Sequence, residues 1–381
     1  MKYFETYRSN TYAGSGNQYI FSAEEKRVGR IFYKIANGGS FSYSFLFSNT
    51  VDSTFSNGAV SHKNLICDEW QILGVRVGRC AEIERRTFQM TDEKEYPEIV
   101  MGEDASEADI AVGDFKEVTF CGEKQKLVHP GEMFASDPVC LTLNAGEYLC
   151  LEIAFQGSMI PSHEESIIPC FIKTGEKWTF SKKMPYASMV GCDRKVDVRV
   201  GYIGDSITQG IGTAINSYAH WNARVSEKLG ERYAFWNLGL GYGRAEDAAS
   251  DGAWLFKAKQ NDVVVVCFGV NDLHQGNSEE QIKKYLLSIV TYLKKAGVKV
   301  LVQTIPPFDY QGAHIQMWKN INEYIRNDLA GVADAVFDVV PVLGKEGEES
   351  HRARYGGHPN AEGCEAWAEA LYPVLKELIE R

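Results

Sequence analysis

The hydrophobic pattern of the 381-residue chain changes near its midpoint, and this change limits the possible folds more than any other feature. From residue 29 to about residue 157 the chain reads as short strands separated by turn residues, and residues 41–47 largely alternate aromatic and polar side chains. After about Lys195, strand-like segments alternate with helix-like segments. We therefore expect two domains, residues 1–195 and residues 196–381.

The first half is expected to form an all-β, jelly-roll-like sandwich, because no long amphipathic helix interrupts its strands. The strand-like segments 139–143 and 148–155 flank turn residues and predict a hairpin. The acidic stretch 91–109 predicts a solvated loop. Residues 158–193 contain three prolines and little periodicity, so we expect a connecting passage there.

The second half predicts a parallel, doubly wound sheet with helices on both faces. Ligands of such sheets bind beyond the carboxyl ends of the strands. The expected strands are residues 198–203, 233–238, 262–268, 298–304 and 335–339, and the expected helices are residues 218–229, 245–258, 279–296, 315–329 and 360–379.

Residues with different chemistry follow these strands at the same edge of the sheet. Ser206 follows the first strand in Gly-Asp-Ser-Ile-Thr, three glycines lie within residues 239–243 after the second, and Asn271 follows the third. His358 precedes the last helix in Gly-Gly-His-Pro. Each residue alone is commonly a turn or surface residue, but together they supply the nucleophile, oxyanion donors and base of acyl transfer.

This set of residues resembles the SGNH hydrolases of the GDSL esterase group over residues 198–381. The resemblance implies a flavodoxin-like three-layer sandwich with a five-stranded parallel sheet. It implies that Ser206 is the nucleophile and His358 the general base and later the acid. The oxyanion hole would consist of the N–H of Ser206, an N–H of the glycine loop, assigned to Gly241, and Asn271 Nδ2. We expect no cofactor and no metal.

Two positions depart from the family pattern. An ungapped match puts Tyr242 where glycine is usual, which requires a backbone geometry that tyrosine can adopt. The aspartate expected three residues before the histidine is replaced by Tyr355. A backbone carbonyl orienting His358 in a Ser–His dyad is the leading replacement, because the third triad member mainly fixes the tautomer and stabilises the imidazolium. The remaining candidates for orienting His358 are Tyr355 itself, Asp338, Glu348 and Glu349.

Such dyads occur in some carbohydrate esterases that, like this chain, join a β-sandwich to an SGNH domain. Residues 45–49, 135–139 and 144–146 give the first half a weaker likeness to those sandwich domains. The resemblance implies that this half could contribute a wall to the catalytic cleft.

The expected substrates are short-chain esters, most simply acetyl esters of carbohydrates, because the rim segments 209–213 and 274–278 are polar and rich in glycine. Four aromatic residues are candidates for stacking on sugar rings, although most of them suit a core position equally well: Tyr218, Phe308, Tyr310 and Trp318. A lysophospholipase or thioesterase and a non-catalytic carbohydrate-binding protein are the alternatives. A metal site formed by His351, His358, Glu348 and Glu349 lacks a helical metal-binding spacing.

The charge composition of the chain limits the classes of partner that it can bind. Lys and Arg number 40 against 51 Asp and Glu, a formal charge of −11, which disfavours nucleic acid and anionic membranes. The expected partner is a small-molecule or oligosaccharide ester, and the oligomeric state stays open. Nine cysteines without a Cys-x-x-Cys pair predict buried free thiols, including Cys121 and Cys140. With no long apolar stretch and no leader-like opening, we expect a cytoplasmic protein.

Overall fold

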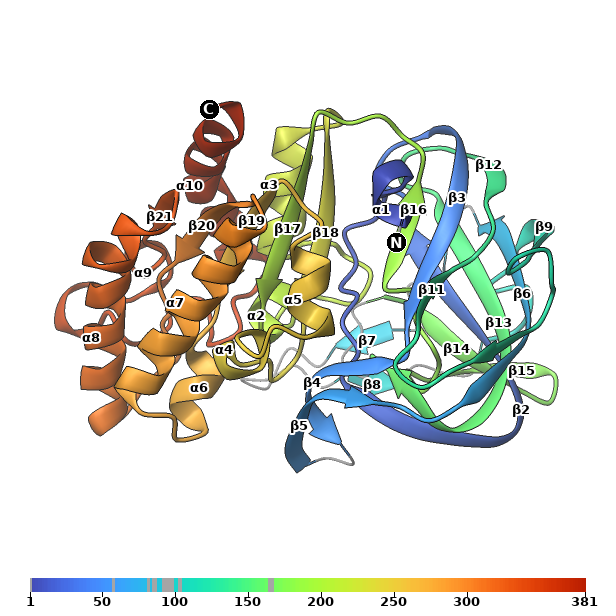
Figure 1. The fold of residues 1–381 in the computed structure, drawn as a ribbon, viewed down its shortest axis with the longest axis horizontal. Helices are drawn as coiled ribbons and strands as arrows, with labels where there is room; N and C mark the ends of the chain where they lie inside the picture. The colour runs from blue at the N-terminus through green and yellow to red at the C-terminus, as the bar shows by residue number, and fades with distance from the viewer. Residues whose placement is uncertain are drawn as a thin grey trace. The chain divides into compact units, whose positions relative to one another are not determined.

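The computed structural model describes residues 2–56, 59–80, 83, 88–90, 99–101, 105–163 and 168–381. The chain divides into two compact units (Figure 1). The first unit comprises Met1–Val51 and Phe55–Lys195, and the second comprises Asp52–Thr54 and Val196–Arg381. A three-residue segment from the first half of the sequence is therefore part of the second unit.

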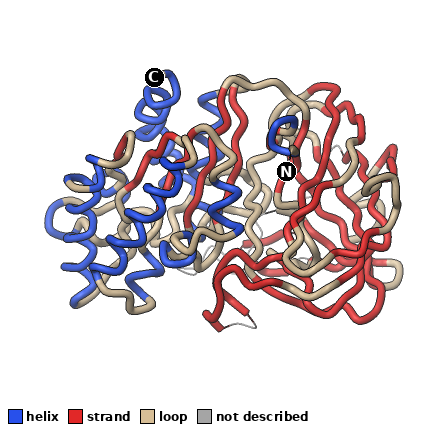
Figure 2. The backbone as a smooth tube through the Cα atoms, viewed as in Figure 1, coloured by secondary structure: helices blue, strands red, loops and turns tan. Residues whose placement is uncertain are grey.

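The first unit consists mainly of two antiparallel sheets, which confirms the expected β-sandwich class. Strands dominate this part of the backbone in Figure 2. One sheet has the order β1 (Arg8–Ser9), β16 (Met189–Cys192), β3 (Gly39–Ser48) and β11 (Met133–Ala135), with β12 (Val139–Leu143) also on β3. The other has the order β10 (Lys126–Val128), β6 (Trp70–Cys80), β13 (Tyr148–Ser162), β2 (Tyr19–Lys34), β14 (Cys170–Thr174) and β15 (Lys177–Phe180), with β9 (Gly113–Val118) on β6.

Smaller elements complete the first half of the chain: helix α1 (Tyr3–Thr6) and the two-stranded pairs β4 (Thr50–Ser56) with β5 (Ala59–Ile66) and β7 (Phe88–Met90) with β8 (Ile99–Met101). The core is aromatic, and the rings of Phe47 and Phe134 stack with centroids 5.3 Å apart. Trp70 Nε1 of β6 donates to Asn49 Oδ1 beside β3 at 2.8 Å. This bond satisfies the buried indole N–H of Trp70 within the sandwich.

Several local expectations for this unit were wrong. β12 pairs with β3, whereas β13 pairs with β2 and β6, so the turn between them joins two sheets instead of closing a hairpin. The passage 158–193 contains β14, β15 and β16 and is not an irregular connection. Of the acidic stretch 91–109, residues 91–98 and 102–104 lie outside the described residues, and β8 occupies part of the rest.

The cysteines are all free, and seven of them are buried. Cys121 and Cys140 are exposed, which corrects the expectation for these two. Cys140 lies at an outward-facing position of β12, and Cys121 has φ 53° in a turn. Neither cysteine is buried, although apolar residues flank both in the sequence.

The second unit contains a five-stranded parallel sheet in the order β18-β17-β19-β20-β21, the flavodoxin-like order, as expected. Its strands are β17 (Val198–Gly204), β18 (Tyr233–Gly239), β19 (Val263–Cys267), β20 (Lys299–Gln303) and β21 (Ala335–Phe337). Its α-helices are α2 (Ser206–Gln209), α3 (Trp221–Leu229), α4 (Ala245–Ala248), α5 (Ala253–Ala258), α6 (Val270–His274), α7 (Glu279–Lys295), α8 (Ala313–Asn327), α9 (Val340–Leu343) and α10 (Ala361–Glu380). Short 3-10 turns lie at Leu329–Gly331 and Gly347–Glu349.

Helices cover both faces of this sheet (Figure 1). Helices α3 and α10 pack together on one face, where Trp221 and Trp367 stack with ring centroids 4.7 Å apart. Helices α5, α7 and α8 cover the other face, because the crossovers that follow β18 run in the opposite direction from the first. The chain therefore reverses direction at β17, and the carboxyl ends of β17 and β19 form the switch point where ligands are expected.

The single helix expected over residues 245–258 is two short helices. Asp251 has φ 57°, a left-handed conformation that cannot continue an α-helix. Gly252 then starts α5 in an extended conformation. The apolar periodicity runs through this break, which is why the pattern alone predicted one helix.

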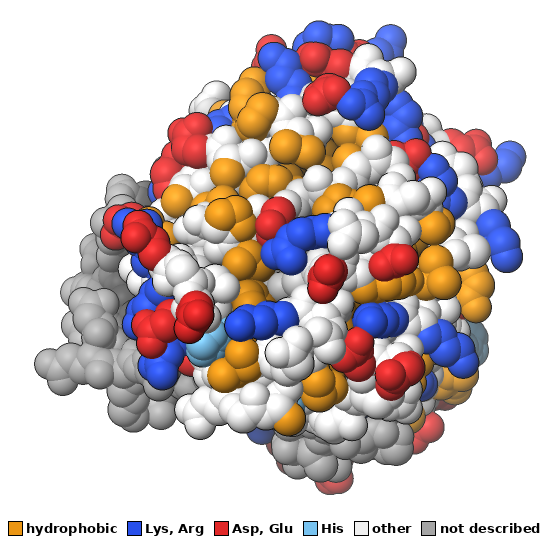
Figure 3. Space-filling model, turned by 90° about the vertical axis from the view of Figure 1, so that its left-hand side faces the viewer, with side chains coloured by type: hydrophobic (Ala, Val, Ile, Leu, Met, Phe, Trp, Pro, Cys, Tyr) orange, Lys and Arg blue, Asp and Glu red, His pale blue; other side chains and the backbone are white. Residues whose placement is uncertain are grey.

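The surface carries charges of both signs. On the face shown in Figure 3, acidic and basic side chains are interspersed. Ion pairs such as Lys283–Glu279 at 2.6 Å and Lys294–Asp334 at 2.5 Å join neighbouring side chains of the second unit. Within the described part of the chain, no helix is both long enough and apolar enough to cross a bilayer.

Candidate active site

Ser206 is the first residue of α2, directly beyond the carboxyl end of β17. Asp205 caps this helix by accepting a hydrogen bond from the Ile207 N–H at 2.9 Å. Two glycines let the helix approach the strand ends closely. A Cβ at Gly204 would lie 2.1 Å from Thr208 Oγ1, and a Cβ at Gly239 would lie 2.1 Å from the Gln209 nitrogen. The sheet edge thus fixes the serine backbone.

The carbonyl groups of the short helix α2 are held by buried side chains. Trp221 Nε1 donates to the Ile207 carbonyl at 3.1 Å, and Asn222 Nδ2 donates to that of Thr208. Asn237 Nδ2 donates to the Gln209 carbonyl at 3.1 Å. A four-residue helix has little stability of its own, so these partners stabilise the turn that presents Ser206.

His358 meets Ser206 across the switch point. The distance from Ser206 Oγ to His358 Nε2 is 2.7 Å, a short hydrogen bond. Burial lowers the pKa of His358 to about 4, because the charged imidazolium is poorly solvated there. The histidine is therefore neutral at pH 7 and able to accept a proton from the hydroxyl.

The backbone and ring of His358 are packed from two sides. A Cβ at Gly212 would lie 2.7 Å from the carbonyl oxygens of both His358 and Pro359. The Phe308 ring lies edge-to-face with the imidazole at a centroid distance of 5.3 Å, and it also lies against Gly357. Because these contacts need no carboxylate, packing contributes to holding the histidine loop.

The glycine loop after β18 forms a tight turn. The Gly243 N–H donates to the Leu240 carbonyl at 3.0 Å, and Tyr242, the third residue of the turn, has φ 58°. A type II turn normally has glycine at this position, and tyrosine there costs about 1–2 kcal/mol. Tyr242 thus adopts the backbone conformation usual for glycine. The N–H of Gly241 has no partner within the described part of the chain, and neither has that of Ser206.

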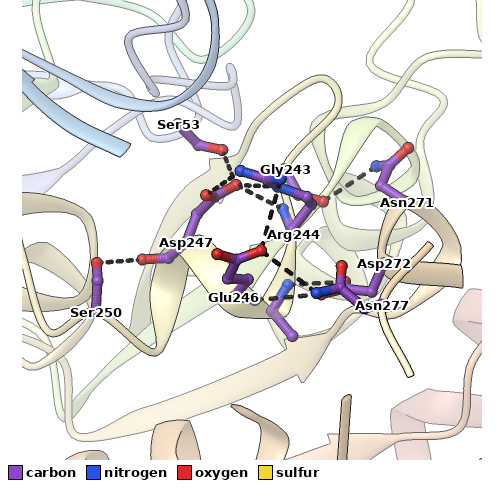
Figure 4. Close-up of polar contacts among 10 residues, drawn as sticks. Ser53, Gly243, Arg244, Glu246, Asp247, Ser250, Asn271, Asp272 and Asn277 are labelled. Carbon is purple, nitrogen blue, oxygen red and sulfur yellow. Dashed lines mark hydrogen bonds and ion pairs between the residues drawn. The ribbon is translucent and has the colours of Figure 1, made fainter. Parts of the chain in front are cut away.

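Asn271 lies next to this loop at the start of α6 (Figure 4). Its Nδ2 donates to the Gly243 carbonyl at 3.1 Å, which leaves the second N–H of the amide for another acceptor. The following residue, Asp272, accepts hydrogen bonds from the N–H groups of Ala245 at 2.9 Å and Glu246 at 3.2 Å. The Asn271 amide and the glycine loop are therefore mutually fixed.

Two buried carboxyl groups accompany these residues. Burial raises the pKa of Asp205 to about 7, and the nearby charge of Asp272 contributes. Burial likewise raises the pKa of Asp272 to about 7, against the opposing effect of its two backbone hydrogen bonds. Neither carboxyl group was predicted from the sequence, although each is adjacent to a predicted site residue. Their signal was position: a carboxylate beside a candidate catalytic residue at a strand end.

The structure shows where the side chains considered for orienting His358 lie. Asp338 accepts from Arg326 Nε and Thr304 Oγ1, each at 2.8 Å. Glu348 and Glu349 are exposed on a 3-10 turn. Tyr355 packs on helix α10, where a Cβ at Gly363 would lie 2.6 Å from the tyrosine Cβ.

The four aromatic residues predicted as candidates for sugar stacking differ in their burial. Tyr218, Tyr310 and Trp318 are buried core residues, whereas Phe308 is partly exposed beside His358. His274, on α6, extends this rim, with its ring 5.5 Å from that of Phe308. Among the described residues, no group of three or more His, Cys, Asp or Glu side chains is placed to hold a metal ion.

The arrangement combines a hydroxyl, a neutral imidazole that accepts its proton, and amide donors from two neighbouring loops. These are the components of acyl transfer through a serine ester. The four site residues predicted from the sequence lie around the carboxyl ends of β17, β18 and β19: Ser206, His358, Asn271 and Gly241.

Part of the second unit is similar to a known protein family. The GDSL-like Lipase/Acylhydrolase family matches residues 202–366. No curated protein matches the chain.

Among solved structures, a carbohydrate acetylesterase family member from Sinorhizobium meliloti is similar at 16% identity and a TM-score of 0.39, covering 49% of this chain and 100% of that one. A member of the lipolytic protein G-D-S-L family from Veillonella parvula aligns at 18% identity and a TM-score of 0.38, covering 47% and 98%. A psychrotrophic esterase from Pseudoalteromonas sp. aligns at 16% identity and a TM-score of 0.38, covering 49% and 100%.

Proposed function

Because residues 202–366 of this chain belong to the GDSL-like Lipase/Acylhydrolase family, we propose that the protein is a serine esterase that hydrolyses short-chain esters, with acetyl esters of carbohydrates as its substrates. The observation that carries this proposal is the 2.7 Å contact between Ser206 Oγ and His358 Nε2 at the switch point of the sheet. A hydroxyl and an imidazole at this distance form a nucleophile–base pair.

The proposed reaction has two halves. Ser206 Oγ attacks the ester carbonyl carbon while His358 Nε2 takes its proton, and the carbonyl oxygen gains the negative charge. The N–H groups of Ser206 and Gly241 and the free N–H of Asn271 Nδ2 would stabilise this oxyanion. The intermediate then expels the alcohol, which takes the proton from His358. Water, activated by the same histidine, hydrolyses the acyl-enzyme and releases the acid.

A short acyl group is supported by the distribution of exposed apolar side chains. Long-chain substrates need a sizeable apolar surface near the nucleophile. The large exposed apolar side chains among the described residues are Ile66, Leu127, Tyr242, Phe256, Leu287 and Val332. Of these, only Tyr242 lies on a loop at the strand ends that carry the site.

Acetate release tests the proposal. The wild-type protein is assayed with acetylated xylo-, manno- and cello-oligosaccharides and with p-nitrophenyl acetate and octanoate. We expect Ser206→Ala to abolish hydrolysis, while Ser288→Ala, which removes an exposed hydroxyl on α7, leaves it unchanged. Faster cleavage of the octanoate than of the acetate would contradict the short-acyl proposal and favour the lysophospholipase or thioesterase alternative. Carbohydrate binding without hydrolysis would favour the non-catalytic alternative.

A further inference from the structure

The second unit includes three residues that lie far from it in the sequence, Asp52–Thr54. The side chains of Asp52 and Ser53 are both fully buried. Burial of a charged residue and a hydroxyl is costly unless each finds a partner. Both find partners on the short helices that follow the glycine loop.

Asp52 is held by a buried ion pair. Lys257 Nζ on α5 donates to Asp52 Oδ2 at 2.6 Å, and neither side chain is exposed to solvent. A pair of this kind is demanding in geometry, because each charge relies on the other for the solvation that it has lost. The Asp52–Thr54 segment is thereby anchored to the second unit at one fixed position.

Ser53 contacts the glycine-loop region directly. Its Oγ donates to Asp247 Oδ2 on α4 at 2.5 Å (Figure 4). The same carboxylate accepts from Arg244 Nε at 3.0 Å, from Arg244 Nη2 at 2.7 Å and from the Arg244 N–H at 3.3 Å. Ser53 therefore completes the environment of a carboxylate that holds both the side chain and the backbone of Arg244.

Arg244 follows Gly243, whose carbonyl accepts the hydrogen bond from Asn271 Nδ2. Asp272 ties the neighbouring N–H groups of Ala245 and Glu246 to the start of α6. A continuous chain of contacts thus runs from Ser53 through Asp247, Arg244 and Gly243 to Asn271. Figure 4 shows these side chains converging around the first turn of α4.

We propose that Ser53, anchored through Asp52, is a positioning residue for the oxyanion donor Asn271, so that the first half of the sequence supplies part of the esterase site. The inference rests on the proposed function. Asp247 could hold Arg244 without the serine, but the Ser53 hydroxyl fixes which way the buried carboxylate faces. A donor displaced by a fraction of an ångström loses part of its effect on the transition state, while substrate binding is barely changed.

The test is a double-mutant cycle on short-chain ester hydrolysis with the full chain. We expect Asn271→Ala to lower kcat about 100-fold, as loss of an oxyanion donor does. Ser53→Ala should lower kcat about 10-fold, a fraction of that loss, with KM within about twofold of wild type. If Ser53 acts through Asn271, adding Ser53→Ala to Asn271→Ala should lower kcat no further.

Ser250→Ala is the matched control, because its Oγ donates to the backbone carbonyl of the same Asp247 at 2.5 Å. It should leave kcat unchanged. An unchanged kcat in Ser53→Ala, or multiplicative losses in the double variant, would overturn the inference while leaving the proposed function intact. If Ser53→Ala does not fold, Asp247→Asn enters the same cycle. Hydrolysis that does not depend on Ser206 would overturn both.

Discussion

The packing of Phe308 on His358 leads to a prediction about pH. A general base works only while it is neutral, so kcat/KM should fall at low pH as His358 becomes protonated. Burial lowers the pKa of this histidine from 6.5 to about 4. With a pKa of 4, about 90% of the histidine is neutral at pH 5, against about 3% for an ordinary histidine. The wild-type enzyme should therefore keep most of its activity at pH 5.

Phe308→Ala removes the ring that packs on the imidazole and on Gly357. Water then reaches the imidazole, the imidazolium is better solvated, and the pKa of His358 rises. A rise of about one unit would reduce the relative activity at pH 5 from about 90% to about 50% of the plateau. Phe256→Ala, which truncates an exposed ring on α5, is the matched control and should keep the wild-type profile.

The assay measures kcat/KM for p-nitrophenyl acetate hydrolysis between pH 3.5 and 8, after subtraction of the rate of spontaneous hydrolysis. The buried carboxyl groups Asp205 and Asp272, with pKa values of about 7, titrate well above the histidine. Their inflection is therefore separate from the one at low pH. A wild-type profile without an acid limb near pH 4 would refute the lowered pKa of His358. An unshifted limb in Phe308→Ala would refute the part assigned to the ring.

Three further predictions concern stability and the support of the site. Lys257→Met should lower the free energy of unfolding by about 3–5 kcal/mol, because Asp52 is left buried without its partner. In denaturant titrations, the double variant Lys257→Met, Asp52→Leu should recover most of this loss. An equal loss of stability in the single and the double variant would contradict the ion-pair account. The pKa of Asp272 is higher in the folded protein than its ordinary 3.8, so its stabilising effect is complete below about pH 4 and is lost as pH rises through about 7. The free energy of unfolding should therefore fall between about pH 4 and 7, by up to about 1.4 kcal/mol per pH unit for such a group, and level off above pH 7. Asp272→Asn should have a shallower slope over this range, and parallel slopes would count against a raised pKa. Gly239→Ala puts a Cβ 2.1 Å from the Gln209 nitrogen and should shift α2, which lowers kcat more than tenfold and the free energy of unfolding by about 1–3 kcal/mol. The control Gly331→Ala adds a Cβ in open space and should change neither quantity. Normal activity in Gly239→Ala would show that α2 is not held by this contact.

The order of the second unit could be predicted because each strand is a short apolar run that ends in turn residues. The strands at Val198–Gly204 and Tyr233–Gly239 match the expected ranges to within one residue. The sheet topology then brings Ser206, the glycine loop and Asn271 to one edge without any further information. That is why a set of individually weak signals identified the candidate site.

Contacts between distant segments could not be predicted in the same way. The turn between β12 and β13 can be predicted from the local sequence. Whether the two flanking strands pair with each other depends on the other strands with which each can pair. Ser53 lies 194 residues from Asp247, and no pattern in the sequence links them. Burial of Asp205 and Asp272 likewise depends on the packing around the strand ends. From the sequence alone, an aspartate directly after a strand is typical of an ordinary turn.

The central claim is that Ser206 is activated by His358 as the nucleophile of an esterase. Its most direct test is labelling of the wild-type protein with a serine-reactive phosphonate, followed by peptide mapping by mass spectrometry. We expect a single adduct on Ser206, no adduct in Ser206→Ala, and much slower labelling in His358→Ala, because the hydroxyl loses the base 2.7 Å away. An unlabelled wild-type protein, or an adduct on any other residue, would contradict the claim.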